Sequence, residues 1–336
     1  MIDTAHVSLA HGNGGRLMRE LIEQVFAHHL SNPSLDVGLD AAPFEIAPGM
    51  VPYITTDSFI VQPLEFPGGD IGTLAVNGTV NDLAVSGAQP RYLTLNAIIE
   101  EGLEMECLDR LVKSLAGAAR AAGVRVIAGD TKVVPRGQGG GLYLATTGVG
   151  FRAAGCPLGM DRIQVGDVLL VSGPVGDHGI AVMLAREEFG LHGSVESDCA
   201  AVTPLTAPLA TIAGLRFMRD PTRGGLATVA HELASATRFD VRLAESRIPV
   251  RDAVRSFCHI LGYDPYYLAS EGRVVAVAAP DAAEQILAQW RATPGGELSS
   301  VIGAMGDGAG RVILETEIGG ERFLEELEDD PLPRIC

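Results

Sequence analysis

Aromatic residues, paired cysteines and long apolar runs are all scarce in this sequence. Phe, Trp and Tyr make up only 5% of its 336 residues. The five cysteines are scattered, without a CxxC pair or another paired zinc-binding set, which favours a reducing compartment. No apolar run approaches the roughly 20 residues that a membrane-spanning helix needs, and the first residues lack the pattern of a signal peptide. We therefore expect a cytoplasmic protein that does not span a membrane.

Positive charge is scarce as well. The chain has 25 Lys and Arg against 42 Asp and Glu, which gives a net charge of −17. Such a surface repels nucleic acids and anionic membranes, so a phosphate-rich ligand needs a local positive site or a metal ion. The sequence also lacks the GxxxxGK[ST], HExxH and GxSxG motifs, which excludes a P-loop, a zinc-protease helix and a hydrolase elbow. If the chain uses ATP, it holds the nucleotide with carboxylates and backbone groups.

Small aliphatic residues and glycine dominate what remains. Hydrophobic residues make up 47% of the chain and 41 residues are Gly, which is typical of an α/β enzyme. The length exceeds what one core normally organises, so we expect two domains. A loop-like stretch at 152–162 places the boundary near 155. We predict an N-terminal domain over 1–154, a C-terminal α/β domain over 155–316 and a mobile tail over 317–336.

Two carboxylates occur where α/β enzymes often hold a metal. Asp57 lies towards the end of a strand predicted over 51–60, and Asp82 lies inside an apolar helix predicted over 71–85. A buried carboxylate needs a partner or a cation. Each residue therefore has two interpretations: a satisfied structural cap, or a metal ligand.

A third carboxylate is followed by a lysine. The apolar strand predicted over 124–128 is followed at once by Asp130, with Lys132 two residues further on. Carboxylates that hold Mg²⁺, beside a cation that neutralises phosphate oxygens, suit a nucleoside triphosphate. A surface turn with a solvated lysine is the alternative.

Glycines precede two predicted helices. One group stands before an amphipathic stretch at 17–26 and comprises Gly12, Gly14 and Gly15. Another stands before a helix predicted over 226–236, together with two charged residues, and comprises Asp220, Arg223, Gly224 and Gly225. Glycines in front of a helix let backbone N–H groups reach a phosphate. The first group is not a GxGxxG motif, and a plain N-terminal turn explains it equally well.

The last part of the sequence contains two more residues of interest. Glu271 precedes a strand predicted over 274–278, and its local pattern is that of a solvated strand-edge residue. Cys336 follows an acidic, proline-containing stretch that we expect to be extended and mobile. This stretch is either an ordinary disordered tail or an arm whose thiol is loaded in one place and processed in another.

Five motifs, in this order, resemble the aminoimidazole ribonucleotide synthetase superfamily. They are Thr55-Thr56-Asp57-Ser58-Phe59, Asn81-Asp82-Leu83, Gly129-Asp130-Thr131-Lys132, Asp220-Pro221-Thr222-Arg223-Gly224-Gly225 and Ser270-Glu271-Gly272-Arg273. The opening His-Gly-x-Gly-Gly and the closing Pro-Arg-Ile-Cys are most similar to the HypE family of hydrogenase maturation proteins, the carbamoyl dehydratases. The resemblance runs from residue 11 to residue 336.

The resemblance implies two α/β domains, with N-terminal domains pairing into a β-barrel in a homodimer that binds ATP. In HypE-like proteins the carbamoyltransferase HypF loads a carbamoyl group onto the terminal cysteine, here Cys336. ATP then drives dehydration of this S-carboxamide to a thiocyanate. The cyanide passes to iron held by HypC and HypD, on its way to a [NiFe]-hydrogenase.

The resemblance also implies roles for the residues singled out above. Asp57, Asp82 and Asp130 would hold Mg²⁺ and ATP, with Asp220 as a further metal ligand. Lys132 would face the phosphates or polarise the carbonyl, and Glu271 or Lys132 would accept protons. The remaining residues would contact phosphate or fold over the nucleotide: Arg223, Gly224, Gly225, Gly12, Gly14 and Gly15.

Two other classes of function stay open at this point. One is another ATP-using enzyme of the superfamily, such as a selenophosphate synthetase or a small-molecule kinase. The former needs a reactive cysteine near its N-terminal glycine loop, whereas the first cysteine here is Cys107. The other is a non-enzymatic carrier with a docking tail, which would not need Asp82, Lys132 or Glu271.

Overall fold

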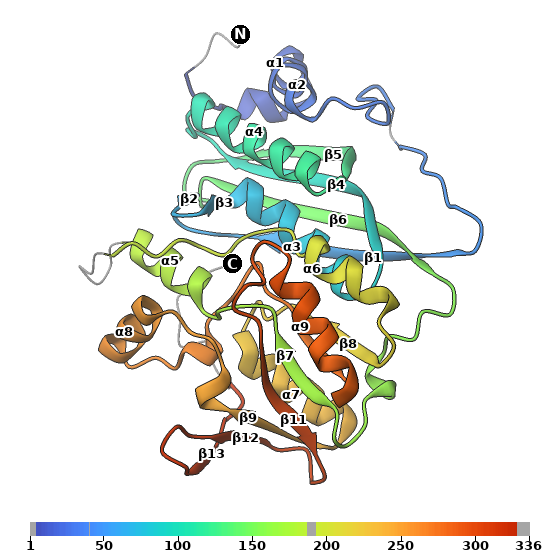
Figure 1. The fold of residues 1–336 in the computed structure, drawn as a ribbon. Helices are drawn as coiled ribbons and strands as arrows, with labels where there is room; N and C mark the ends of the chain where they lie inside the picture. Colours follow the sequence, from blue (N-terminus) through green and yellow to red (C-terminus); the bar gives the residue numbers. More distant parts are fainter. Residues whose placement is uncertain (1–4, 40, 187–192, 328–336) are drawn as a thin grey trace. The chain divides into compact units, whose positions relative to one another are not determined.

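The structure, a computed structural model, describes residues 5–39, 41–186 and 193–327 (Figure 1). The chain divides into two compact units. The first contains the described residues up to 83 together with 88–154, and the second contains 84–87 and the described residues from 155 onward. No helix in these described ranges is both long enough and apolar enough to cross a membrane.

The first unit is built on a four-stranded mixed sheet with the order β1-β6-β4-β5. Its strands are β1 (Met50–Phe59), β4 (Gln89–Glu100), β5 (Arg125–Val134) and β6 (Leu142–Ala153). The β1–β6 and β6–β4 pairs are antiparallel, and the β4–β5 pair is parallel. A small hairpin of β2 (Glu65–Phe66) and β3 (Gly69–Asp70) accompanies it.

Helices cover one face of this sheet, and Figure 1 shows two of them lying along it. These two helices are α3 (Ile71–Val85) and α4 (Met105–Ala121). The N-terminal helical segment adds η1 (Leu9–Gly12), α1 (Arg16–Leu21), the π-helical η2 (Ile22–Ala27) and α2 (His28–Leu30). Residues of β4 such as Leu95 and Ile99 point to this inner face and are buried. The alternate residues point to the outer face, where Ile54 is 73% and Ile98 is 40% exposed.

The second unit is built on a seven-stranded sheet with the order β13-β12-β9-β11-β7-β10-β8. Its strands are β7 (Val168–Val171), β8 (Leu215–Arg219), β9 (Asp240–Ala244), β10 (Val275–Ala278), β11 (Ser300–Gly306), β12 (Val312–Glu315) and β13 (Glu321–Phe323). The β9–β12 pair is parallel and the other pairs are antiparallel.

Both faces of this larger sheet are buried. Leu169 and Val171 of β7 pack into one cluster with α7 (Gly225–Thr237). Leu170, between them, packs into another cluster with α9 (Ala283–Arg291). Figure 1 shows α9 in front of the sheet and α7 behind it. Burial on both faces explains why β7 and β10 are continuous apolar runs. The remaining helices are α5 (Asp177–Ala185), α6 (Thr203–Thr206), α8 (Asp252–Leu261) and the 3-10 turns η3 (Met160–Arg162), η4 (Ala207–Thr211), η5 (Glu245–Arg247), η6 (Pro265–Tyr267) and η7 (Pro280–Ala282).

The mobile tail was predicted to start at residue 317, but the residues that follow still belong to the folded second unit. Strand β13 pairs with β12, and Leu324 is only 1% exposed within the core. His231 Nε2 lies 2.8 Å from the carbonyl oxygen of Leu324, and the Tyr267 hydroxyl donates to that of Glu325 at 2.7 Å. Charged residues around 317–326 concealed this short edge strand. Residues 328–336, including Cys336, lie outside the described residues.

Asp240 secures the β11–β12 connection and provides a test of stability. Its Oδ1 accepts the backbone N–H groups of Ala309 and Arg311, both at 2.9 Å, and its Oδ2 accepts from the Arg311 guanidinium at 2.8 Å. The Arg311 side chain, followed by these backbone donors, lowers the pKa of Asp240 from 3.8 to about 2. A lowered pKa means that this stabilisation is complete well above pH 4 and is lost as the pH falls towards 2.

We therefore expect Asp240→Asn to lower the free energy of unfolding by about 2 kcal/mol at pH 7. The gap between the variant and the parent should roughly halve near pH 3, because the unfolded carboxyl is then protonated. Urea unfolding at several pH values measures it. A gap that does not change with pH would show that the ionised carboxylate is not the source.

Candidate active site

Two predicted carboxylates lie between β1 and α3, on the inner face of the first unit. Thr55 and Asp57 are two residues apart on β1, so their side chains point to the same face of the sheet. Thr79 and Asp82 lie three residues apart on α3. The Thr55 hydroxyl donates to Asp82 Oδ2 at 2.7 Å, and the Thr79 hydroxyl donates to Asp57 Oδ2 at 3.0 Å. Asp82 is therefore satisfied by a strand threonine rather than by a helix cap. The reciprocal pairs place the two carboxylates at neighbouring positions.

Asp130 and Lys132 lie within β5, not just beyond a strand as the sequence predicted. Only the first part of the strand is apolar, and the later part alternates between the two faces. Thr131 is buried, whereas Asp130 and Lys132 are exposed. Lys132 Nζ lies 3.0 Å from Asp130 Oδ2, and Thr131 N–H donates to Asp130 Oδ1 at 2.9 Å. The hydrogen bond from Lys132 lowers the pKa of Asp130, so this carboxyl is ionised.

The predicted set of three carboxylates is not assembled within one chain. Asp57 pairs with Thr146 on the inner face, and Asp130 pairs with Asn96 on the outer face. Strands β1 and β5 are the two edges of the sheet, about 14 Å apart at the usual strand spacing. Across the described ranges, no three His, Cys, Asp or Glu side chains are placed to hold a metal ion together. Asp220 is likewise part of no such group.

The N-terminal glycines lie against the β5 edge. A Cβ on Gly12 would come within 2.8 Å of the backbone nitrogen of Val133, the neighbour of Lys132. Gly14 has a φ of +80°, which favours glycine. Gly15 N–H donates to Asn13 Oδ1 at 3.2 Å, in front of α1. The predicted glycine loop and the predicted lysine are thus brought close together.

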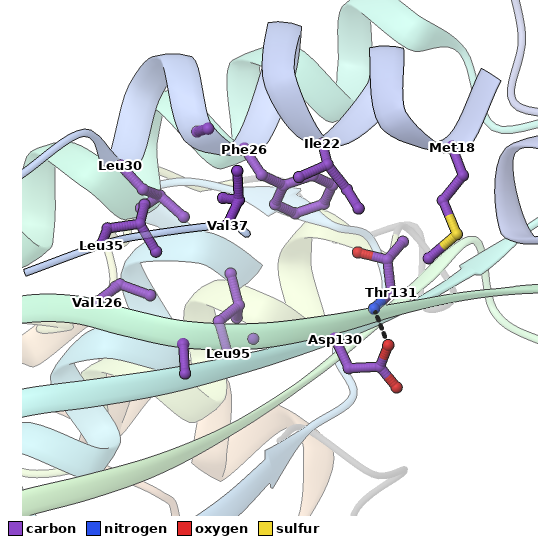
Figure 2. Close-up of a pocket in the computed structure, with 13 residues that line it drawn as sticks. Met18, Ile22, Phe26, Leu30, Leu35, Val37, Leu95, Val126, Asp130 and Thr131 are labelled. Atoms are coloured by element: carbon purple, nitrogen blue, oxygen red, sulfur yellow. Dashed lines mark hydrogen bonds between the residues drawn. The ribbon is translucent and has the colours of Figure 1, made fainter. Parts of the chain in front are cut away.

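A cavity of about 120 Å³ opens beside this loop, between the N-terminal helical segment and β4–β5. Its lining is mostly apolar and includes Met18, Ile22, Phe26 and Leu95. Figure 2 shows Thr131 pointing towards the helical segment and Asp130 pointing away from it. Asp130 and Lys132 thus present their charge on the side of β5 opposite the helical segment.

The second unit brings the other predicted residues together. Ser270 N–H donates to the carbonyl of Pro221 at 3.0 Å, which joins the Asp220–Gly225 loop to the Glu271 loop. Asp220 is 4% and Glu271 is 3% exposed, so Glu271 is not the solvated residue that its local pattern indicated.

The paired glycines open α7 as predicted. Gly224 and Gly225 both have positive φ, at +71° and +62°. A Cβ on Gly225 would lie 2.5 Å from the Tyr266 carbonyl oxygen. Arg223, directly before them, is exposed.

One neighbour of Glu271, Asp198, had no signal in the sequence. Asp198 Oδ1 accepts Glu271 N–H at 3.0 Å, and Arg273 Nε lies 3.2 Å from Asp198 Oδ2. Asp198 lies in a polar stretch without periodicity, so nothing in its local sequence distinguishes it. His178, on α5, is fully buried, and its Nδ1 lies 2.8 Å from the Ser197 hydroxyl.

Comparison with known protein families shows the class of protein to which the two domains belong. Residues 38–152 match the family described as AIR synthase related protein, N-terminal domain, and residues 164–315 match its C-terminal domain. The predicted two-domain mixed α/β fold is confirmed.

More similar relatives define the particular family. Carbamoyl dehydratase HypE of Azotobacter vinelandii is 46% identical over 332 residues, covering 98% of this chain and 97% of that protein. A crystal structure of hydrogenase maturation protein HypE in complex with ATP is 42% identical with a TM-score of 0.93, covering 98% of this chain and 99% of that one. A HypE–HypF complex is 41% identical with a TM-score of 0.80, covering 91% and 99%. The chain therefore belongs to the HypE family of carbamoyl dehydratases, and it is an enzyme. This membership sets aside the kinase, selenophosphate synthetase and carrier alternatives.

Proposed function

We propose that the chain uses ATP to dehydrate an S-carboxamide on Cys336 to a thiocyanate, which supplies the cyanide ligand for the iron of a [NiFe]-hydrogenase. The observation that carries this proposal is the match to a carbamoyl dehydratase along nearly the whole length of both chains. The similarity to a HypE solved with ATP supports the choice of nucleotide.

The chemistry proceeds in two balanced steps. The amide oxygen attacks the terminal phosphorus of ATP, ADP leaves, and the nitrogen gives up one proton. The phosphorylated oxygen then departs as inorganic phosphate while the nitrogen loses its second proton, leaving S–C≡N. The protein must therefore position the amide, neutralise phosphate charge and accept protons.

Residues of this chain suit each task. Lys132 supplies the cation, oriented by its ion pair with Asp130. Glu271 is the proton acceptor, because it is a carboxylate held on a well-anchored loop. Arg223 and the N–H groups of Gly224 and Gly225 contact phosphate, as a helix start with an adjacent guanidinium is suited to do.

Mg²⁺ fits the pair Asp57 and Asp82. Carboxylate oxygens are the donors that this ion prefers, and it is commonly held by one or two carboxylates plus substrate phosphates. The neighbouring positions of the two side chains meet that requirement. When bound, the ion would neutralise charge on the phosphate oxygens. Asp130 then orients Lys132 through their ion pair and does not bind the metal ion.

A homodimer completes the site in this proposal. The residues of one chain lie at opposite edges of the four-stranded sheet, with Asp57 on β1 and the Lys132–glycine loop region on β5. An uncovered ten-residue edge strand and the exposed apolar residues Ile54 and Ile98 favour pairing of this sheet with a second copy. Pairing β1 of one chain beside β5 of the other brings the two halves together.

The proposed partners follow from the chemistry of the thiol. HypF loads the carbamoyl group, which is supported by a relative solved in a HypE–HypF complex. HypC and HypD receive the cyanide. Cys336 must stay reduced to be loaded, so we place the reaction in the cytoplasm.

Mass spectrometry of the intact protein tests the proposal directly. The protein is incubated with the carbamoyltransferase, carbamoyl phosphate and Mg-ATP, and digestion then locates the adduct. We expect a carbamoyl adduct on Cys336 that loses one water only when hydrolysable ATP is present. An unmodified Cys336 with another acceptor phosphorylated would instead identify a kinase.

Glu271→Gln is expected to slow thiocyanate formation by about 10²–10⁴-fold, because the glutamine side chain cannot accept the protons that the substrate nitrogen gives up. ATP binding should change little, since the side chain keeps its size. Single-turnover measurement on pre-carbamoylated protein gives the rate, and urea unfolding checks the fold. A variant with the parent rate would exclude Glu271 as the base.

A further inference from the structure

The Glu271 loop is held from one side by the short segment 197–200. Asp198 Oδ1 accepts Glu271 N–H at 3.0 Å, and the same carboxylate accepts the N–H of Gly272. Ala200 N–H donates back to the Glu271 carbonyl at 3.4 Å. A Cβ on Gly272 would lie 1.9 Å from the Asp198 carbonyl oxygen, so only glycine fits there. The backbone of Glu271 is therefore fixed at both its N–H and its carbonyl group.

The side chain that provides this anchor is itself buried, and this burial raises the pKa of Asp198 although Arg273 acts in the opposite direction. The Asp198 side chain is 1% exposed, and its Oδ2 lies 3.2 Å from Nε of the buried Arg273. That Nε–H is donated to the Pro174 carbonyl at 2.9 Å, and Asp198 Oδ2 has no hydrogen-bond donor of its own. Arg273 also lies 3.6 Å from Asp177, which Arg251 binds at 2.8 Å.

A neutral side chain could accept the same two N–H groups without the free-energy cost of burying a carboxyl group beside an arginine. Burying an ionised carboxylate costs several kcal/mol unless it is fully paired, and a single shared guanidinium only partly offsets that cost. Such a feature is expected where the geometry of a loop matters more than its stability. The residue so fixed is Glu271, whose carboxylate must approach the amide nitrogen to hydrogen-bond distance.

We infer that Asp198 is a positioning residue for the dehydration, which aims Glu271 by fixing its backbone while Arg273 holds Asp198 in place. The inference rests on the proposed role of Glu271 as the base. It assigns to Asp198 an effect on the chemical step and none on nucleotide binding.

Asp198→Asn is the discriminating change. The two oxygens of Asp198 face different groups: the Glu271 and Gly272 N–H groups on one side and the Arg273 guanidinium on the other. An amide has one acceptor oxygen, so its NH₂ group faces either the N–H groups of the Glu271 loop or the Arg273 guanidinium. The first orientation loses the hydrogen bonds to the loop and the second loses the ion pair that holds residue 198, although the side chain keeps its volume. We expect the single-turnover rate to fall at least about 10-fold, with ATP affinity within about 2-fold of the parent.

Asp240→Asn is the matched control, because it also removes a buried charge that is paired with an arginine in the same unit. It should destabilise the protein and leave the rate unchanged. Asp198→Glu keeps the charge but lengthens the side chain, so it tests the same point if Asp198→Asn unfolds. We expect it to slow the reaction as well.

The double variant Asp198→Asn/Glu271→Gln separates positioning from general structure. If Asp198 acts through Glu271, the double variant is no slower than Glu271→Gln alone. A further loss by the same factor overturns the inference, as does an Asp198→Asn enzyme that keeps the parent rate while Glu271→Gln is slow. A Glu271→Gln enzyme with the parent rate overturns the proposed role of Glu271 and this inference together.

Discussion

Replacing Cys336 with alanine is expected to abolish thiocyanate formation completely. In the proposed reaction this sulfur carries the group that is dehydrated, so without it no substrate forms on the protein. No other residue can take its place, because the loss is of a reactant and not of a catalyst. ATP binding should persist, since the predicted nucleotide-binding residues all lie elsewhere in the chain. Mass spectrometry after incubation with the carbamoyltransferase and Mg-ATP measures the outcome.

Cys156→Ala is the matched control for this experiment. Cys156 is a free, partly exposed thiol in the second unit. Its removal should leave both carbamoylation and dehydration at the parent level. Thiocyanate on the Cys336→Ala protein would move the acceptor to another thiol and remove Cys336 from the reaction.

The sequence predicted some elements well because their pattern is physically distinctive. The helix over 71–85 was predicted with the bounds that α3 has. Its glycine-rich start and long apolar run suit a helix that is buried on almost every side. Strand β10 was also recognisable, because burial on both faces makes it continuously apolar.

Other elements were misjudged where burial is one-sided. Strand β5 runs six residues beyond the apolar stretch at 124–128, to Val134. Its outer face carries Asp130 and Lys132, which from the sequence resemble the start of a turn. Strand β13 was concealed for the same reason, since its residues are exposed. Composition alone does not distinguish a half-exposed edge strand from a loop.

The candidate site was predictable as a list of residues but not as an arrangement. Motif order identified Asp57, Asp82, Lys132 and Glu271, since each lies in a recognisable local pattern. It did not indicate that Asp57 and Lys132 occupy opposite edges of one sheet, because strand order depends on contacts between distant segments. Asp198 was missed because its role depends on pairing with a loop some 70 residues away.

Mixed dimers should recover activity that neither parent variant has. Asp57→Asn and Lys132→Ala homodimers are each expected to be slower by about 10²–10³-fold, because every site has lost one charged group that acts on phosphate. In a mixed dimer of the proposed architecture, one site carries both changes and the other carries neither. Purified mixed dimers should therefore show about half of the parent rate, as two-fold symmetry requires.

The experiment distinguishes a shared site from a site within one chain. Two affinity tags on co-expressed chains select the mixed dimer, and a dimer of Asp57→Asn with Asp57→Asn/Lys132→Ala is the control that should stay inactive. If Asp57 and Lys132 of the same chain met in one site, every site of the mixed dimer would carry one change and no activity would return. Recovery to about half would place the residues of β1 and β5 in one site built from two copies, because only an exchange between chains leaves one site of the mixed dimer unchanged.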